Sequence, residues 1–249
     1  MLNAWLDAAV ARVSPPLTFT EIRKAVQAVS SFYVERRSSA GLGARTMESD
    51  GKRAAFATYY APLHFMTARR AAEQLSPAVR AAIRRVHDLG CGTGASGVAL
   101  ASACPGDVVI EGIDRSGWAL REARHTYAAF GMRGRTRRAS IPEALPRLRP
   151  GDALVTGWTA NELEQPARVR LLELLVEAAS RGHALLVLEP LARGVAPWWP
   201  SWATALAPHG IRDLDLKFEA ELPDWIARLD QASGLDHSTL GARVLVGPT

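Results

Sequence analysis

The segment "VHDLGCGTGASG" (86–97) begins with apolar residues, turns at a run of glycines and continues into a sequence suited to a helix. Glycines at positions 90, 92, 94 and 97 allow positive φ angles and lack the Cβ atoms that would hold a ligand away from the backbone. The helix start that follows offers N–H groups without partners inside the helix. The segment therefore predicts a strand–turn–helix unit that binds a ligand at the turn, close to the carboxylate of Asp88.

An acidic residue at the end of the next apolar stretch favours a nucleoside ligand. Gly92, Gly94 and Gly97 have the spacing GxGxxG of dinucleotide-binding turns, which is a weak signal by itself. Asp114 closes the stretch "VVIEGID" (108–114), twenty residues after Gly94. A carboxylate at this place accepts hydrogen bonds from a ribose diol, and the alternative is an acid that stabilises a helix start. Both a nicotinamide dinucleotide and S-adenosylmethionine fit these residues.

Asp88 separates the two cofactors, because a carboxylate repels a pyrophosphate and attracts the ammonium and sulfonium groups of S-adenosylmethionine. The pattern "DLGCGTG" (88–94) resembles the first motif of the class I S-adenosylmethionine-dependent methyltransferases, and the resemblance extends over about residues 84–249. It implies S-adenosylmethionine as the cofactor and an α/β fold with a Rossmann-like, seven-stranded, mostly parallel methyltransferase sheet. The last strand, "GARVLVG" (241–247), is antiparallel by the same resemblance.

The candidate cofactor-binding residues all lie at or just after the carboxyl ends of the expected strands: Asp88, Gly90, Cys91, Gly92, Gly94, Asp114, Arg115, Ser140, Ile141, Thr156 and Gly157. By the resemblance, Asp88 faces the amino-acid end of the cofactor and Asp114 holds the ribose. Arg115 lies along the adenine, and Ser140 and Ile141 match the positions at the adenine edge. The glycines line the cofactor.

Catalytic residues are harder to predict, because methyl transfer mainly requires alignment and exclusion of water. A general base is needed only when the acceptor must lose a proton. The segment "TGWTANELEQP" (156–166) follows the fourth strand, where open sheets bind ligands. Its first two residues can meet the methionine end through their backbone. Asn161 and Glu162 are candidates for contact with an acceptor, and a capped helix start is the equal alternative.

The segment "TYYAPLHF" (58–65) supplies two further candidates, Tyr60 and His64, as polar contacts of a lid. A buried aromatic helix face is the alternative. Three tryptophans in "PWWPSW" (197–202) suit either stacking on a planar substrate or burial. The chain lacks the Asn/Asp-Pro-Pro-aromatic motif of amino-group nucleic-acid methyltransferases, and the segment after the fourth strand lacks a cysteine nucleophile. Methylation of nucleic-acid amino groups and methylation of a pyrimidine ring through a cysteine nucleophile are therefore disfavoured.

The periodicity predicts two parts. Residues 1–80 form a helical extension on the acceptor side, and residues 81–249 form the cofactor-binding domain. Apolar runs predict parallel strands near 85–89, 107–113, 135–139, 152–157 and 184–188. Helices are expected between them near 94–103, 116–130 and 166–181. The alternating segment 211–218, a helix in "PDWIARLDQA" and the strand 241–247 complete the chain. Pro62 is expected to kink or interrupt a helix.

Arginine dominates the positive charge, and the net charge is +5. Six arginines gather between positions 133 and 149: Arg133, Arg135, Arg137, Arg138, Arg147 and Arg149. Arginine binds phosphate well, so the segment predicts RNA as a partner. A compositional bias with a solvated rim explains the same residues equally well.

The cysteine content, the histidine spacing and the hydropathy of the sequence bear on disulfides, metal sites and membrane spans. With Cys91 and Cys104 alone, a disulfide framework or an all-cysteine metal cluster is not expected. The histidines show no metal-ligand spacing, so no metal is predicted. No apolar run reaches the roughly 18 residues of a membrane span, and we expect a cytoplasmic protein without membrane contact. The oligomeric state is left open.

A closer resemblance concerns the stretch "DALVTGWTANELEQPARVRLLELLVEAASRGHALLVLEP" (152–190), which is similar to the Rsm22-like (ribosomal small-subunit-associated) methyltransferases. This resemblance implies ribosomal or other RNA as the methyl acceptor. Many of those proteins carry a later cysteine cluster, which this chain lacks, so the metal of that cluster is not carried over. The alternatives are a small-molecule methyltransferase, a non-catalytic RNA-binding assembly factor and a nicotinamide oxidoreductase.

Overall fold

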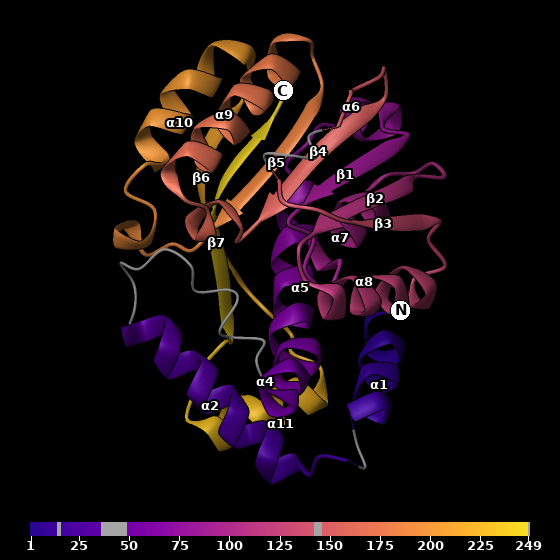
Figure 1. Ribbon diagram of the computed structural model, residues 1–249, viewed down its shortest axis with the longest axis vertical. Coiled ribbons are helices and arrows are strands. Elements are labelled where there is room, and N and C mark those ends of the chain that lie inside the picture. The colour runs from indigo at the N-terminus through magenta and orange to yellow at the C-terminus, as the bar shows by residue number, and fades with distance from the viewer. Residues whose placement is uncertain (14–15, 36–48, 142–145, 249) are drawn as a thin grey trace.

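The computed structural model describes residues 1–13, 16–35, 49–141 and 146–248. Its centre is a seven-stranded sheet with the strand order β3-β2-β1-β4-β5-β7-β6 (Figure 1). The strands are β1 (Arg85–Leu89), β2 (Val109–Asp114), β3 (Gly134–Arg138), β4 (Asp152–Gly157), β5 (Ala184–Glu189), β6 (Arg212–Glu219) and β7 (Thr239–Gly247). Neighbours from β3 to β5 pair in parallel, and β7 is antiparallel to β5 and β6. The expected sheet with its antiparallel last strand is confirmed.

Helices surround the sheet on both faces and at one end. They are α1 (Leu2–Val13), α2 (Phe19–Glu35), α4 (Asp50–Ala55), α5 (Ala61–Ala72), α6 (Pro77–Ala82), α7 (Ala95–Ala103), α8 (Gly117–Ala129), α9 (Gln165–Ser180), α10 (Trp199–Leu206) and α11 (Asp224–Ser233). Shorter turns are η1 (Phe56–Tyr60), η2 (Ala160–Glu162), η3 (Arg193–Val195) and η4 (Ala207–His209). The helices α7, α8 and α9 lie within one residue of the ranges expected from the sequence.

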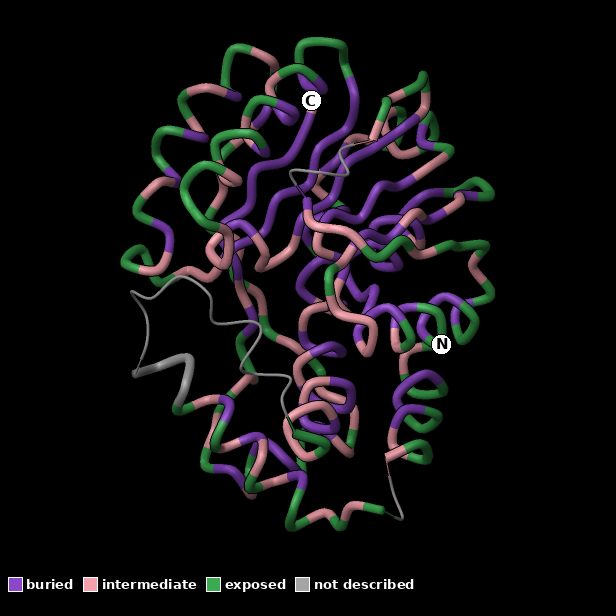
Figure 2. Tube along the Cα trace, viewed as in Figure 1, coloured by how far each residue is buried: buried purple, intermediate pink, exposed green. Residues whose placement is uncertain are grey.

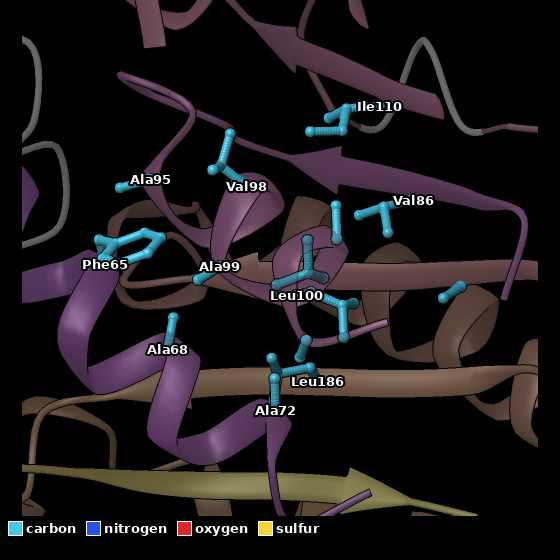
Figure 3. Packing of buried hydrophobic residues seen from close by; sticks show 14 of the residues in the cluster. Phe65, Ala68, Ala72, Val86, Ala95, Val98, Ala99, Leu100, Ile110 and Leu186 are labelled. Atoms are coloured by element: carbon cyan, nitrogen blue, oxygen red, sulfur yellow. The ribbon is translucent and has the colours of Figure 1, made fainter. Parts of the chain in front are cut away.

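One face of the sheet packs on α5 and α7. Val86 of β1 and Ile110 of β2 are fully buried in a cluster that contains Val98 of α7 and Ala68 of α5 (Figure 3). Because α5 presents alanines to α7, the two helices approach closely. The N-terminal half of the chain therefore contributes directly to the core beside the glycine turn.

The opposite face is covered by α9 and α10 over β4, β5 and β7. Leu154, Leu185 and Leu245 are fully buried there. Trp199 and Trp202 of α10 pack in the same cluster and are buried. The sequence allowed the tryptophans either to stack on a planar substrate or to be buried. Trp199 and Trp202 are buried in the core. The central strands β4 and β5 are buried almost throughout, as the purple segments of the sheet in Figure 2 show.

A third core joins the start of the chain to its end. Ile22 and Val26 of α2 pack with Ile226 and Leu229 of α11, and α2, α4 and α11 lie together at the lower end of the molecule in Figure 1. Separately, α1 packs on α8, where Arg12 forms an ion pair of 2.8 Å with Glu122. The residues expected to form an extension thus share cores with the sheet domain, and the division at residue 80 stays a prediction.

The helices α4 and α5 are joined through the π-helical turn η1 into one continuous helical segment. The N–H of Ala61 donates to the carbonyl of Phe56, five residues earlier. Pro62 lies in the first turn of α5, so the expected interruption takes the form of a widened turn just before the proline. π-helical turns of this kind are frequent at functional sites.

Within the described ranges no helix combines the length and the hydropathy that a membrane crossing requires. The cytoplasmic location expected from the sequence stays a prediction.

Candidate functional site

The glycine turn between β1 and α7 has the backbone that its sequence predicts. Gly90, Gly92 and Gly94 have φ angles of +71°, +50° and +80°. A Cβ atom on Gly90 would lie 2.2 Å from a side-chain carbon of Thr159. By contrast, a Cβ atom on Gly92 would meet no atom within 4 Å. Gly90 is therefore required by packing, whereas Gly92 borders open space where a ligand can approach.

Asp114, at the end of β2, holds this turn in place. Its Oδ2 accepts a hydrogen bond of 2.9 Å from the N–H of Gly92. Its Oδ1 accepts one of 2.7 Å from the N–H of Ser116 at the start of α8. Each carboxylate oxygen has a further lone pair, so the same side chain can still accept hydrogen bonds from a ribose diol. The structure places Asp114 beside the open side of the glycine turn, as the sequence predicts.

Asp88, at the end of β1, is 1 % exposed. Its Oδ2 accepts a hydrogen bond of 2.9 Å from the N–H of Gly97, but its Oδ1 has no partner. Burial raises the pKa of Asp88 to about 7, and the negative charge of Asp114 acts in the same direction. A buried carboxylate oxygen without a partner is costly, and a cationic group would satisfy it. The residues at this turn therefore fit the ammonium, the ribose and the backbone contacts of S-adenosylmethionine.

The side chain of Cys91 packs inside the fold, and its expected contact with the cofactor stays a prediction. Its N–H donates to the carbonyl of Ile113, and its thiol faces β2, where a Cβ atom on Gly112 would lie 2.8 Å from Sγ. The hydroxyl of Tyr127 lies at the same place, 2.4 Å from that Cβ position. Burial raises the pKa of the Cys91 thiol well above its usual range. The sequence did not indicate Tyr127, because an aromatic residue on a helix has no signal of its own.

Thr156 and Gly157 end β4 beside the turn. Thr156 is 1 % exposed, and its hydroxyl finds no hydrogen-bond partner. Gly157 lets α7 approach β4, since a Cβ atom there would lie 2.4 Å from the hydroxyl of Ser96. The hydroxyl of Thr159 donates to the carbonyls of Gly90 at 3.1 Å and Gly157 at 3.0 Å. Thr159 thus ties the loop after β4 to the glycine turn, which the sequence did not reveal.

The residues expected near the adenine lie at the ends of β2 and β3. Ile141 is buried in the cluster of α9 and α10 that also contains Leu89 and Ile113, and Ser140 is half-buried. The carbonyl of Arg115 accepts a hydrogen bond of 3.1 Å from the side chain of Arg138. Ile141 can offer an apolar edge, while the side chain of Arg115 lies near Glu162, whose pKa its charge affects.

Asn161 and Glu162 lie in the short helix η2. This agrees with the second interpretation of the sequence, in which the two residues belong to the start of a helix. Burial raises the pKa of Glu162 to about 7, the charge of Arg115 lowers it, and the charge of Asp114 raises it further. The charges of Arg115 and Asp114 thus both act on Glu162. The N–H of Asn161 donates to Glu189 at 3.2 Å. Burial raises the pKa of Glu189 to about 8, so the pKa values of three carboxyl groups, Asp88, Glu162 and Glu189, are raised by burial.

A line of ring contacts crosses from the end of β4 to the start of β7. Its five centroid distances run from His64–Trp158 at 3.9 Å through Phe56–His64 at 5.8 Å, Phe56–Tyr60 at 6.1 Å and Tyr59–Tyr60 at 5.0 Å to Tyr59–His237 at 5.7 Å. The turn η1 and the first turn of α5 supply the middle of this line. The line places aromatic and imidazole rings next to the loop that follows β4.

His64 and Tyr60 have different positions in this line. The His64 ring stacks on Trp158, with planes 9° apart. Desolvation lowers the pKa of His64 to about 3, and the charge of His237 adds to the effect, so His64 is neutral and a weak base at pH 7. The Tyr60 hydroxyl donates to the carbonyl of Val26 in α2 at 3.1 Å. The Tyr60 hydroxyl is thus turned toward α2, and only its ring joins the aromatic line.

Trp158 has a φ angle of +54°, a left-handed conformation in a residue other than glycine. Such a conformation costs roughly 1–2 kcal/mol and persists where the surroundings enforce it. The N–H of Trp158 donates to the carbonyl of Leu188 at 2.8 Å, and its ring is fixed by His64. The strained residue lies directly after Gly157, the last residue of β4.

A hydrogen-bonded group of three side chains ends the aromatic line. The hydroxyl of Tyr59 donates to Oδ1 of Asp230, and the same carboxylate oxygen lies 2.7 Å from Nδ1 of His237. The N–H of His237 donates to Oδ2 of Asp230 at 2.8 Å. Tyr59 and Asp230 are buried, whereas the side chain of His237 is 32 % exposed. Asp230 and His237 are far from the other site residues in the sequence and carry no motif, so sequence reasoning missed them.

In the described part of the chain, no three histidine, cysteine, aspartate or glutamate side chains come together in a way that would hold a metal ion. The arginines between positions 133 and 149 form several separate pairs. Arg133 pairs with Asp107 at 2.6 Å, and Arg135 pairs with Glu111 at 2.6 Å.

Comparison with known proteins bears directly on this site. Residues 86–182, which run from β1 to the end of α9, match a protein family described as "Methyltransferase domain". The chain is an S-adenosylmethionine-dependent methyltransferase. The cofactor is therefore S-adenosylmethionine, and the nicotinamide alternative is set aside. A search of curated proteins found no match to this methyltransferase.

Solved structures share its fold. An O-methyltransferase from neocarzinostatin biosynthesis, in complex with S-adenosylmethionine and 2-hydroxy-5-methyl naphthoic acid, has a TM-score of 0.53 and 17 % identity, over 98 % of this chain and 72 % of that one. The mitomycin 7-O-methyltransferase has a TM-score of 0.51 and 14 % identity, over 97 % and 72 % of the two chains. The pyocyanin biosynthetic protein has a TM-score of 0.50 and 18 % identity, over 84 % and 62 %. None of these comparisons points to the Rsm22-like proteins, and that closer resemblance stays a prediction.

Proposed function

We propose that the methyltransferase acts on a small, planar organic acceptor whose hydroxyl or amino group takes the methyl group. The observation that carries this proposal is the line of rings from Trp158 to His237. Ring faces bind flat, apolar molecules through large contact areas. Because Trp158 directly follows the end of β4, an acceptor against these rings would lie next to the sulfonium end of the cofactor.

In this proposal the residues of the glycine turn bind the cofactor, which supplies an activated methyl group when bound. Asp88 faces its ammonium group, and Asp114 accepts hydrogen bonds from the ribose. The open side of Gly92 receives the nucleoside. Glu162, which the sequence offered as a catalytic residue, is assigned to the ribose side because the charge of Asp114 acts on it.

His237 is the proton acceptor in the proposed reaction. Asp230 accepts the hydrogen bond from Nδ1–H of His237, which leaves Nε2 without a proton and free to act as a base. As the acceptor oxygen or nitrogen forms its bond to the methyl carbon, the bond from that carbon to sulfur breaks and sulfur keeps the electron pair. The proton of the acceptor passes to Nε2 of His237. Asp230 and Tyr59 are positioning residues, because they fix the orientation and the tautomer of the ring.

His64 and Trp158 form a wall in this proposal. A pKa of about 3 makes His64 a poor proton acceptor at pH 7, so its ring rather than its basicity would be used. Asn161 offers an unpartnered side-chain oxygen, Oδ1, after β4, and it remains a candidate for a polar contact with the acceptor. The names of two similar structures, both small-molecule O-methyltransferases, agree with this assignment.

RNA remains the alternative acceptor, and its support is the arginine-rich segment 133–149. A small molecule and RNA require different contact surfaces on the protein. A small molecule needs only to reach the rings between Trp158 and His237, whereas RNA must also contact a cationic surface outside them.

The test is a competition for label from methyl-labelled S-adenosylmethionine. Purified protein is incubated with phenols, catechols and aromatic amines in one series and with ribosomal RNA in the other. We expect label in the small-molecule fraction, and its loss when His237 is replaced by alanine. Label in RNA alone would overturn the proposed acceptor. The matched control is His125→Ala, because His125 is exposed on α8.

A further inference from the structure

The strand β5 ends in a fully buried acid, Glu189. The five residues before it, "ALLVL" (184–188), are apolar and buried, so a further apolar residue would suit this position. Glu189 is 0 % exposed, and burial raises the pKa of its carboxyl group to about 8. Burying a carboxyl group costs free energy unless the group is hydrogen-bonded. The hydrogen bonds of Glu189 therefore indicate what the acid does.

The register partner of Glu189 in the sheet is an arginine that pairs elsewhere. Arg243 of β7 lies opposite Glu189, and its guanidinium forms ion pairs with Asp213 at 3.9 Å and Asp215 at 3.6 Å, both in β6. In the part of the chain that the structure describes, no ion pair joins Arg243 to Glu189. The carboxyl group of Glu189 is directed instead to the loop that follows β4.

In that loop the carboxyl group serves the short helix η2. Its Oε1 accepts a hydrogen bond of 3.2 Å from the N–H of Asn161, and the N–H of Ala160 also donates to it. N–H groups in the first turn of a helix have no partner inside the helix, and Thr159, the residue before η2, supplies no side-chain cap. Because Ala160 is fully buried, water cannot replace the carboxyl group there. Glu189 thus caps η2 from a neighbouring strand.

The same loop touches both halves of the site. The hydroxyl of Thr159 donates to the carbonyl of Gly90 in the glycine turn at 3.1 Å. Trp158, with its left-handed φ angle of +54°, stacks on His64 of α5 at 3.9 Å. The N–H of Trp158 donates to the carbonyl of Leu188 at 2.8 Å. The last two residues of β5 therefore hold the loop on both sides of Thr159.

We propose that Glu189 is a positioning residue for methyl transfer. It acts through residues 158–162, because it fixes the conformation in which Thr159 meets the glycine turn and Trp158 meets His64. Since its carboxyl group is fully buried, it acts on the loop and not on the reacting atoms. The inference needs only the cofactor site and this loop. It does not depend on the class of the acceptor or on the proton acceptor His237.

The experiment compares Glu189→Gln and Glu189→Ala in the full-length protein by NMR. Glutamine keeps an oxygen that can accept from the N–H of Asn161, whereas alanine removes both oxygens. The imidazole resonances of His64 report on the loop, because the ring current of a stacked indole shifts them. Their loss in His64→Phe assigns them. The control, Glu177→Ala, removes an exposed acid of α9 that pairs with Arg181.

We expect Glu189→Gln to keep the ring-current shift of His64 and Glu189→Ala to lose most of it. A carboxyl group with a pKa of about 8 is largely protonated at pH 7, and an amide of the same shape can replace it. The control Glu177→Ala should keep the shift as well.

A second measurement is the calorimetric titration of each variant with S-adenosylhomocysteine. The affinity should fall about two- to tenfold in Glu189→Ala, as for the loss of one hydrogen bond, because Thr159 then holds the glycine turn less firmly. Glu189→Gln and Glu177→Ala should bind S-adenosylhomocysteine as the wild type does.

Two results would overturn the inference. One is a Glu189→Ala protein with a lower Tm but with the His64 resonances and the affinity of the wild type, since Glu189 would then serve stability alone. The other is an equal loss of the His64 shift in Glu177→Ala.

If Glu189→Ala does not fold, the same comparison uses Glu189→Asp. Aspartate keeps the charge but withdraws the carboxyl group by one methylene group from the N–H of Asn161. We expect this variant to lose part of the His64 shift and part of the affinity. An unchanged shift and an unchanged affinity in Glu189→Asp would contradict the positioning role.

Discussion

His64 of α5 stacks on Trp158 of the loop after β4, with ring centroids 3.9 Å apart and planes within 9° of parallel. This contact fixes a residue with a left-handed backbone beside the expected methyl-transfer site. It also ties the N-terminal half of the chain to the cofactor domain. The acceptor side of the site is therefore built by two parts of the chain that are distant in sequence.

Two substitutions of His64 test whether the site uses its ring as a contact surface or its nitrogen in a proton transfer. His64→Phe keeps a flat ring on Trp158, whereas His64→Ala removes it. Since His64 is neutral at pH 7, we expect the phenylalanine variant to retain activity. The alanine variant should raise KM for the acceptor by about two- to tenfold, as for the loss of one aromatic pair. Steady-state kinetics measure both, and an inactive phenylalanine variant would show that an imidazole nitrogen is required.

The histidine at the other end of the aromatic line should behave differently. His237→Ala removes the proposed base, and we expect kcat to fall about 10²- to 10⁴-fold with unchanged affinity for S-adenosylhomocysteine. Asp230→Asn should lower kcat as well, because an amide no longer selects the tautomer with a free Nε2. The control is His125→Ala on the exposed face of α8. Equal kcat values in His237→Ala and His125→Ala would refute the assignment of the base.

Asp114 is expected to accept hydrogen bonds from the ribose of the cofactor. Asp114→Asn keeps the size of the side chain but loses the charge and one acceptor, and it places an amide NH₂ against the N–H groups of Gly92 or Ser116. We expect the affinity for S-adenosylhomocysteine to fall by about 1–3 kcal/mol, as for charge-assisted hydrogen bonds. Calorimetric titration measures this change. The control is Asp107→Asn, an exposed acid paired with Arg133, and an unchanged dissociation constant in the Asp114 variant would remove it from the ribose site.

The cofactor half of the site could be predicted from the sequence because its residues are local. A glycine turn and the two acids at neighbouring strand ends are fixed by the strand–turn–helix unit itself. Parallel strands carry their ends to one edge, so Asp88 and Asp114 must approach each other once β1 pairs with β2. The seven-stranded, mostly parallel sheet with its antiparallel last strand followed from the family resemblance and was confirmed.

The acceptor half could not be predicted in the same way. Tyr59, Asp230 and His237 come together only because α11 packs on α2 and on the turn η1. No spacing in the sequence encodes that tertiary contact. For the same reason the sequence could not show that the Tyr60 hydroxyl binds the carbonyl of Val26 in α2.

Two glycines of the turn should respond differently to alanine. Gly92→Ala meets no atom within 4 Å, whereas Gly90→Ala would collide with Thr159. Both substitutions strain a positive φ angle by about 1–2 kcal/mol, so the difference between them reports the collision. We expect Gly90→Ala to lower Tm further than Gly92→Ala. Gly92→Ala should lose most affinity for S-adenosylhomocysteine in spite of its smaller effect on Tm. Thermal melts and titrations check both, and full affinity in Gly92→Ala would place the ligand elsewhere.

The buried carboxylate of Asp88 gives the protein a pH-dependent stability. Burial raises its pKa from 3.8 to about 7 in the folded state, so between these values the folded protein holds a proton that the unfolded chain releases. The stability linked to Asp88 is therefore complete below about pH 4 and is lost as pH rises through about 7, with a slope of up to about 1.4 kcal/mol per pH unit.

Asp88→Asn removes this titration and keeps an oxygen that can accept from the N–H of Gly97. Relative to the wild type, the variant should gain stability as pH rises from 4 to 8, although Glu162 and Glu189 titrate in the same range in both proteins. Urea unfolding at several pH values measures the difference. In the wild type, S-adenosylhomocysteine should bind more tightly as pH rises through about 7, since its ammonium group pairs with the ionised carboxylate. If the difference in stability between the two proteins stayed constant from pH 4 to 8, Asp88 would be ionised throughout, and its unpartnered oxygen would need another cation in the folded protein.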